Sequence, residues 1–401
     1  MGVAQADVVA RATWSALVEP GDAVAGVLVD LLGAGPALGW VRSAVRDGPD
    51  LEQVERLHGP LVDADRRRLG RSVERWAARL PDCDPGRDLE RLDRIGGTLL
   101  VPGDQRWPTA LDDLGAEAPF CLWVRGAADL GAALERSAAV VGSRAATSYG
   151  ERVAFDLADG LSSAGVRVVS GGAYGIDAAA HRGAVARDGR TVVVLAGGVD
   201  RAYPAGNARL LEAVVGAGGA LVSEVPTGSL PTKSRFLQRN RLIAAAGRAT
   251  VVVEAAWRSG AMSTAHHAAR LLRPVGAVPG PVTSMASAGC HRLLREGVAV
   301  CVTDAAEVRE LAGLIGVELT AGVDADRSAD LRSARPQDGL DPVVRRVLDA
   351  LPRRVPAALD RVASMAGVSV TEARGALGLL ELDGWAEQRG AGWVGARIGT
   401  S

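Results

Sequence analysis

The feature that most constrains this chain is a pair of strand–helix units in tandem between residues 137 and 189. An apolar run at 138–141 ends at Gly142-Ser143-Arg144, and a helical pattern follows. A second β-branched run at 166–169 ends at Ser170-Gly171-Gly172-Ala173-Tyr174-Gly175, and another helix is expected from about residue 176. In such units the loops after the strands lie at one edge of a parallel sheet. Helix N-termini face that edge and favour an anion there.

The same alternation continues toward residue 278. It predicts four further strands, at 191–196, 220–223, 249–254 and 275–278, with helices at 207–216, 234–246 and 263–272. Mostly β-branched strands alternating with helices are typical of an α/β fold with a doubly wound parallel sheet. Right-handed crossovers would gather the strand-end loops on one rim, which is where we expect the functional site.

Composition narrows the class of protein and its compartment. The chain has 401 residues and is 48% hydrophobic, enough for two or three folded domains. Its four cysteines form no C-x-x-C pair, which argues against a disulfide framework or a zinc site and favours a cytoplasmic location. We see no signal peptide or membrane-spanning run, so no membrane partner is expected. Because the net charge is -1, the protein as a whole does not attract a polyanion, which would have to bind a local positively charged patch.

Changes in composition and in hydrophobic spacing along the sequence predict four parts. Residues 1–95 show helical spacing and are expected to form an N-terminal helical domain, SAM- or helix-hairpin-helix-like in pattern. Arginines 66–68 there directly follow Asp63 and Asp65, which favours a solvated mixed-charge face over a phosphate footprint. Residues 96–315 form the sheet domain, with short strands leading into it, and 316–342 form a polar, flexible linker.

The last part, residues 343–398, has the pattern of three helices and a hairpin, which is a winged helix. Its third helix carries Glu372, Glu381 and Asp383 against the single cation Arg374. Such a helix is a poor phosphate binder. A protein-docking or dimer-tuning module is therefore favoured over a duplex reader.

The sharpest electrostatic feature is an interval without acidic residues between Glu224 and Glu254. Its cations are Lys233, Arg235, Arg239, Arg241 and Arg248, and Phe236 stands among them. Cations that follow phosphates around a ring that stacks on a base suit single-stranded nucleic acid. The alternative is a solvated helix with Phe236 in the core. Spacing alone leaves the two open, and the expected place on the rim favours binding.

Several motifs that would indicate an enzyme are missing. No G-x-G-x-x-G follows the first strand and no G-x-x-x-x-G-K-[ST] occurs, so neither a dinucleotide nor a nucleoside triphosphate site is indicated. The adjacent residues Cys290 and His291 make a poor catalytic dyad, and the adjacent His266 and His267 are poorly spaced for shared metal ligation. We expect no catalytic residue, cofactor or metal.

Taken together, the motifs are similar to those of the DNA-processing protein A (DprA, also called Smf) family. The matching residues are Gly142-Ser143-Arg144, Ser170 to Asp177 with Ala180-His181, Tyr203-Pro204 with Asn207, Ser223-Glu224, Phe236 to Arg241, Val253-Glu254-Ala255, Ser259-Gly260, Ser263-Thr264 and Pro279-Gly280. They occur in the family's order over roughly residues 91–312.

This resemblance implies an extended Rossmann-like, non-enzymatic protein. A member would form a homodimer, bind single-stranded DNA in a basic pocket, and load the RecA recombinase onto incoming DNA in natural transformation. Arg144, Lys233, Phe236 and the run Arg239-Asn240-Arg241 match positions that the family uses for the strand. The candidate DNA-binding residues are Ser143, Arg144, Gly171, Gly172, Tyr174, Gly175, Lys233, Arg235, Phe236, Arg239, Asn240 and Arg241.

The sequence departs from the family's pattern at some positions, and its glycine turns also leave an enzyme alternative open. Tyr174 stands where some members have a lysine, so we expect a phosphate contact there to be either missing or replaced by stacking. Nucleoside-monophosphate phosphoribohydrolases share similar glycine turns, but the glutamate of their P-G-G-x-G-T-x-x-E loop corresponds here to His267. Glu224 and Glu254 are the remaining candidate bases, and we expect a structural capping role for them first.

Overall fold

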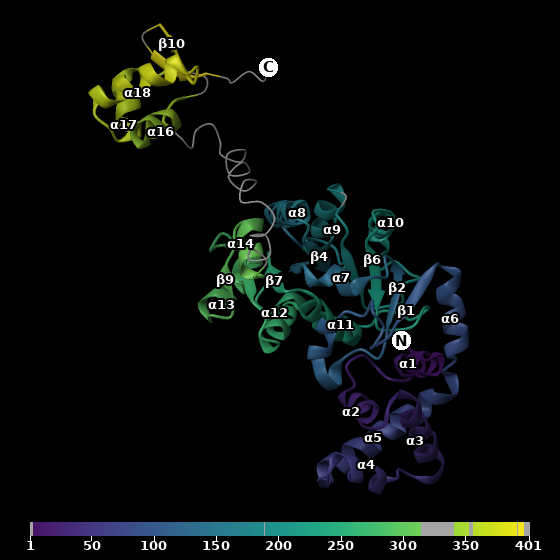
Figure 1. Ribbon diagram of the computed structural model, residues 1–401. Helices are drawn as coiled ribbons and strands as arrows, with labels where there is room; N and C mark the ends of the chain where they lie inside the picture. Colours follow the sequence, from purple (N-terminus) through teal and green to yellow (C-terminus); the bar gives the residue numbers. More distant parts are fainter. Residues whose placement is uncertain (1–2, 188, 314–340, 353–355, 391, 397–401) are drawn as a thin grey trace. The chain divides into compact units, whose positions relative to one another are not determined.

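The computed structural model describes residues 3–187, 189–313, 341–352, 356–390 and 392–396 (Figure 1). It divides into two compact units, residues 1–317 and 318–401, and each is described by itself. The flexible linker predicted at 316–342 lies outside the described residues except for its last two positions.

The first unit begins with a helical part, as the sequence predicts. Its helices are α1 (Gln5–Leu17), α2 (Ala23–Leu32), α3 (Ala34–Asp47), α4 (Leu51–His58), α5 (Asp63–Arg79), the short 3₁₀ helix η1 (Leu80–Asp82) and α6 (Pro85–Arg94). The Trp14 ring meets Trp76 edge-on and stacks on Phe120, with centroids 5.6 Å apart in both pairs. Since Phe120 comes from the segment before the second strand, the helical part and the sheet part share a core.

A nine-stranded sheet follows. Its strands are β1 (Gly97–Leu100), β2 (Leu122–Gly126), β3 (Ser137–Val141), β4 (Arg167–Ser170), β5 (Val192–Leu195), β6 (Ala220–Ser223), β7 (Ala249–Val252), β8 (Val275–Ala277) and β9 (Val300–Cys301). The spatial order is β1-β2-β6-β5-β4-β3-β7-β8-β9. Strands β3 to β9 pair in parallel, while β2 pairs antiparallel with β1 and β6. All six predicted strands are confirmed.

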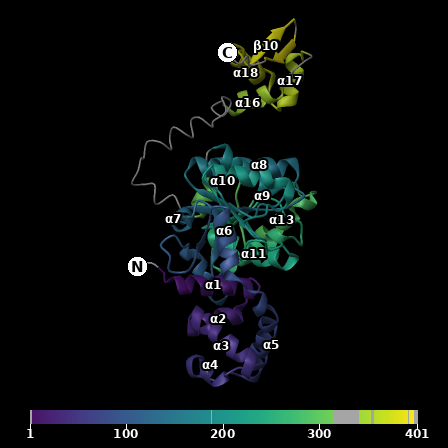
Figure 2. The same ribbon diagram turned by 90° about the vertical axis from the view of Figure 1, so that its right-hand side faces the viewer.

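Helices cover both faces of the sheet (Figure 2). They are α7 (Leu130–Glu135), α8 (Ser148–Ser163), α9 (Ile176–Ala186), α10 (Ala208–Gly216), α11 (Lys233–Ala246), α12 (Gly260–Arg270), α13 (Ala288–Arg295) and α14 (Ala305–Leu311), with 3₁₀ helices η2 (Thr109–Glu117), η3 (Ala205–Asn207) and η4 (Met285–Ser287). Side chains of α8, α9 and α14 form one buried layer, and those of α11, α12 and α13 form another. The sheet is therefore doubly wound.

The strand order creates a switch point between β3 and β7. The chain moves outward from β3 through β4 and β5 to β6, then returns to pair β7 on the other side of β3. In open α/β sheets, ligands bind outside the carboxyl ends of the strands at such a point, because the loops diverge there and leave a crevice.

The second unit is a winged helix, as predicted. It contains α16 (Pro342–Asp349), α17 (Leu359–Ala366), α18 (Val370–Leu382), β10 (Ala386–Arg389) and β11 (Gly392–Gly395). Val347, Val362 and Leu377 are fully buried in its core. Ser369 and Glu372 form a reciprocal capping box at the start of α18.

Among the described residues, no single helix has the length and apolar character needed to cross a membrane. One bent pair, α2 with α3 at 115°, passes on length and composition only when the two are joined.

Candidate functional site

A cleft of about 620 Å³ lies at the switch point. Its walls come from the loops after β3, β4 and β5, from α11 and from the start of α12. The lining residues used below are Ser143, Arg144, Ala173, Asp177, Tyr203, Thr232, Lys233, Phe236, Arg239, Asn240, Ser259, Gly260 and Thr264. The sequence predicted that the site would lie on this rim, and the cleft is where the strand-end loops meet.

Arg144 projects from a loop that is held on both sides. The Ser143 N–H donates to the Glu254 carbonyl over 2.7 Å, and the Ile176 N–H donates to the Ser143 carbonyl over 3.2 Å. These bonds fix the loop after β3 against the end of β7 and the start of α9. The Arg144 side chain is exposed, and within the described chain it has no carboxylate partner. Its Cζ atom lies 4.5 Å from the centre of the Phe236 ring.

Phe236 lies in the wall of the cleft, neither in the core nor free in solvent. The ring is half-buried, with Tyr203 at 5.6 Å between centroids and the Arg239 Cζ atom at 5.8 Å from its centre. Lys233 opens α11 and is exposed. The Thr232 hydroxyl accepts from the Arg235 N–H and caps that helix, so its positive dipole end faces the cleft.

A buried cation forms the floor of the cleft. Arg239 is only 5% exposed, and burial lowers its pKa to about 10 while the neighbouring Asp177 opposes this. It therefore stays protonated at neutral pH. Its Nε and Nη1 atoms have no hydrogen-bond partner within the described residues. A buried guanidinium with unused donors is costly unless an anion completes it, so this floor suits a phosphate.

The glycine loop after β4 brings the backbone close to this cation. A Cβ atom at Gly171 would collide with the Arg239 guanidinium, and one at Gly175 would collide with the Ser143 carbonyl oxygen. Gly175 also has a φ of 71°, which favours glycine. The buried carboxylate of Asp177 accepts from the Gly171 and Ala173 N–H groups over 3.2 and 3.4 Å and holds the loop in place.

Some of the candidate residues from the sequence are not brought into the cleft. Arg235 donates twice to the Glu19 carboxylate, over 2.9 and 3.0 Å. Arg241 is fully buried and donates to Glu224 over 2.6 Å. Tyr174 is 49% exposed and lies outside the lining. Both arginines are thus paired with carboxylates of the same chain, Arg241 in the core and Arg235 near the surface, and their predicted contact with DNA remains a prediction.

Other lining residues were not among the candidates. Tyr203 belongs to the Tyr203-Pro204 motif, and its position beside Phe236 shows only in three dimensions. Asp177 also lines the cleft, but an acidic residue is not expected in a site that binds an anion, so a search for positive charge does not find it. Asn240, which was a candidate, donates from its amide to the Gly260 carbonyl over 3.1 Å and ties α11 to the start of α12.

The strand-end carboxylates have structural roles. Glu254 accepts from the Thr147 N–H and hydroxyl over 2.9 and 2.6 Å, as the expected capping role requires. Glu224 holds Arg241. Cys290 is buried, its thiol faces the Val252 and Val253 carbonyl groups, and burial raises its pKa to about 12. Searching the described residues finds no group of His, Cys, Asp and Glu that could hold a metal ion.

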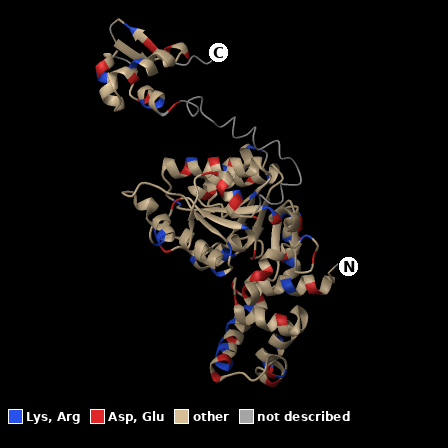
Figure 3. Cartoon of the chain, turned by 60° about the vertical axis from the view of Figure 1, so that its left-hand side comes forward, with Lys and Arg blue, Asp and Glu red and all other residues tan. Residues whose placement is uncertain are grey.

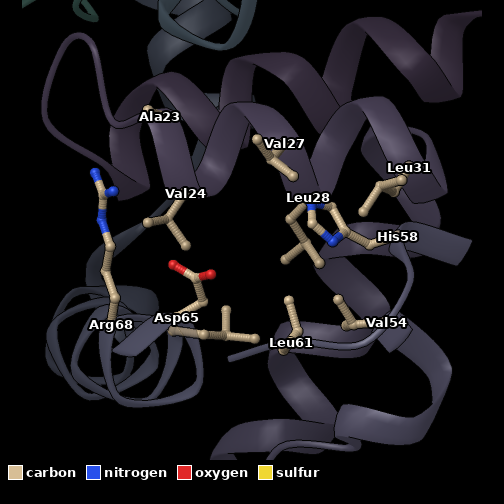
Figure 4. A pocket seen from close by; sticks show the side chains of 11 residues that line it. Ala23, Val24, Val27, Leu28, Leu31, Val54, His58, Leu61, Asp65 and Arg68 are labelled. Atoms are coloured by element: carbon tan, nitrogen blue, oxygen red, sulfur yellow. The ribbon is translucent and has the colours of Figure 1, made fainter. Parts of the chain in front are cut away.

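A second cavity, of about 210 Å³, lies in the helical part (Figure 4). Its lining is mainly aliphatic, from Val24, Leu28, Leu31 and Val54 among others, with His58, Asp65 and Arg68 as polar members. Figure 3 shows cations and carboxylates interspersed over the described chain. The cleft at the switch point is therefore the better candidate for an anionic ligand.

Known proteins resemble this chain in sequence and in structure. The family model described as DNA recombination-mediator protein A matches residues 98–313, and the DprA winged helix domain matches residues 332–392. A putative DNA processing protein DprA of Mycobacterium tuberculosis is 47% identical over 87% of this chain and 91% of its own length. The DNA processing protein DprA of Streptococcus pneumoniae is 38% identical over 53% of this chain and 78% of its own. An X-ray structure of that streptococcal protein aligns with a TM-score of 0.57 and 28% identity, covering 77% of this chain and 98% of the solved one.

Proposed function

The chain belongs to the DNA recombination-mediator protein A (DprA/Smf) family, and from this premise we propose that it binds single-stranded DNA in the switch-point cleft and loads the RecA recombinase onto that strand in natural transformation. The observation that supports this most is the cluster of Arg144, Phe236 and Arg239 beside the glycine loop, in which the two guanidinium groups lie 4.5 and 5.8 Å from one ring centre. Two cations beside an aromatic ring fit a phosphate backbone and an unpaired base.

Each member of this cluster, together with Lys233, has a distinct role in this proposal. Arg239, which is buried and has unused N–H donors, would donate hydrogen bonds to a phosphate at the floor of the cleft. Arg144 and Lys233, both exposed, would neutralise phosphates at the mouth of the cleft. Phe236 would stack on a base. Since stacking and phosphate contacts carry little sequence information, we expect binding to depend on salt much more than on sequence.

We propose that the protein acts without catalysing a reaction. Glu254 and Glu224 are committed to Thr147 and Arg241, and the Cys290 thiol is buried with a raised pKa. These arrangements leave neither glutamate nor the thiol free to act as a base or nucleophile. The Asp177 carboxylate, which lines the cleft, accepts from the Gly171 and Ala173 N–H groups. Release of adenine from AMP by the purified chain would overturn this part of the proposal.

The test of the function has two stages. Affinity for a labelled oligothymidylate is first measured at several salt concentrations for the wild type, Arg144→Ala and Lys233→Ala. Each variant should bind more weakly and with a flatter salt response, by about one unit of slope for each phosphate contact removed. Arg248→Ala is the matched control, because Arg248 is exposed but directly precedes β7, at the opposite edge of the sheet. Wild-type affinity in both rim variants would refute the cleft.

The second stage addresses RecA and self-association. The wild type should shorten the lag of RecA filament growth on strands coated by single-strand-binding protein, whereas Arg144→Ala should not. We also propose that the protein works as a homodimer in the cytoplasm, where RecA and incoming strands meet. Sedimentation of the purified chain as a monomer at all concentrations would contradict the homodimer.

A further inference from the structure

A second aromatic and cationic cluster lies outside the cleft, centred on Trp257. The Trp257 side chain is 44% exposed. The Arg292 Cζ atom lies 5.0 Å from its ring centre, and the Arg295 Cζ atom lies at 5.8 Å. Both arginines come from α13, one turn apart, so their guanidinium groups flank the same ring.

The loop that carries Trp257 is fixed beside the cleft. The Ala255 N–H donates to the Ala286 carbonyl, and the Gly289 N–H donates to the Ala255 carbonyl, both over 2.7 Å. These two bonds tie the loop after β7 to the start of α13. Ser259, two residues after Trp257, already lines the cleft. Trp257 therefore belongs to the same strand-end rim, two residues before the part of the cleft wall formed by Ser259 and Gly260.

The chain segment that carries Trp257 and its two arginines is rich in arginine and lacks acidic residues. The chain carries no Asp or Glu from residue 255 to residue 295. Arg258 and Arg295 are exposed, and neither has a carboxylate partner in the described parts of the chain. Arg292 is paired with Glu296 over 2.8 Å, so its charge is partly offset and it mainly orients the ring.

Packing alone is a weaker explanation for this cluster. A tryptophan that served only to pack would gain most by leaving water completely, because it carries the largest apolar surface of any side chain. Here two arginines of α13 lie beside the ring, yet nearly half of the side chain stays in contact with solvent. An exposed ring among cations is an arrangement that can stack on a base of a single strand.

We propose that Trp257, with Arg258 and Arg295, forms a second stacking platform for a further base of the same single strand. The strand would leave the cleft past Ser259 and Gly260 and reach this platform next. This inference rests on the proposed function of the cleft. It extends the binding path along the rim from α11 to α13.

The test compares two oligothymidylates, one of about 5 nucleotides that the cleft alone can hold and one of about 20 that can reach both sites. Trp257→Ala should weaken binding of the longer strand by about 5- to 100-fold and leave the shorter one unchanged. Trp257→Phe should retain most of the affinity, since phenylalanine also stacks. Arg295→Ala should weaken the longer strand only, with Arg248→Ala as the matched charge control.

The outcomes separate the platform from the cleft. If Trp257→Ala binds the longer strand as the wild type does while Arg144→Ala loses both strands, the platform is refuted and the cleft stands. If Arg144→Ala also binds both strands normally, the cleft itself is refuted. Quenching of tryptophan emission by the longer strand gives a second readout. Quenching of equal size in the wild type and in Trp257→Phe would overturn the platform, as would a change in sedimenting mass of Trp257→Ala that accounts for its lower affinity.

Discussion

The buried pair of Arg241 and Glu224 offers a sharp test of how α11 is held beneath the cleft. Arg241 has no exposed surface, its partner is 8% exposed, and the two are 2.6 Å apart. Replacing Glu224 by Gln leaves an uncompensated guanidinium in the core. Such a loss costs about 3–5 kcal/mol in the free energy of unfolding.

Removing Arg241 should lower the free energy of unfolding by less than removing the charge of Glu224, because an unpaired carboxylate and an unpaired guanidinium respond differently to burial. A guanidinium cannot give up its proton in a protein, whereas a carboxylate can accept one. Burial already raises the pKa of Glu224, although Arg241 opposes it. In Arg241→Met the carboxyl should therefore become protonated, and the destabilisation should be smaller at about pH 5 than at about pH 8. The cost of Glu224→Gln should not show this dependence.

Urea unfolding of the wild type, both single variants and the double variant measures these energies. The double variant should be more stable than the sum of the two single effects predicts, since each single change leaves its partner unpaired. Folded Arg241→Met should bind oligothymidylate nearly as the wild type does, because its charge is used inside the protein. Single variants within about 1 kcal/mol of the wild type, or a loss of affinity equal to that of Arg144→Ala, would refute this reasoning.

Three further predictions follow from the described contacts. Phe236→Ala should weaken oligothymidylate binding by about 5-fold or more in fluorescence anisotropy, and Phe236→Tyr should restore it. Burial lowers the pKa of His181 to about 3. Between pH 7 and pH 5 this imidazole therefore becomes protonated in the unfolded chain but stays neutral in the folded protein. The free energy of unfolding measured in urea should fall by about 2 kcal/mol over this range because of His181. In His181→Gln this part of the pH dependence should be absent. Glu19→Gln should release Arg235 and speed amide hydrogen exchange in the first turn of α11; unchanged exchange would contradict that role.

Local pattern was enough to predict the sheet and the winged helix. Strands β3 to β8 are short β-branched runs closed by glycine or polar turns, so each is visible in a window of a few residues. The rim location followed from the handedness of the crossovers. Strand order could not be read in the same way, because it depends on which side of β3 the returning chain pairs.

The rim on which the candidate site lies could be predicted from the sequence, but the contacts of its residues only in part. Helical spacing predicted which face of α11 carries each cation, but it could not predict which carboxylates the cations pair with. Glu19 is 216 positions away from Arg235 in the sequence, and Glu224 precedes Arg241 by 17. Such long-range partners decide whether an arginine faces a ligand or the core. Trp257 was missed for the same reason, since its two arginines come from a helix more than thirty residues later.

The most direct test of the central claim is photochemical cross-linking of a bromodeoxyuridine-substituted single strand to the full-length protein, with the linked residues mapped by mass spectrometry. The cleft predicts adducts at aromatic residues on the rim, foremost Phe236 and Tyr203, that disappear in Arg144→Ala. Adducts confined to the winged helix, or to the opposite edge of the sheet near Arg248, would contradict the account.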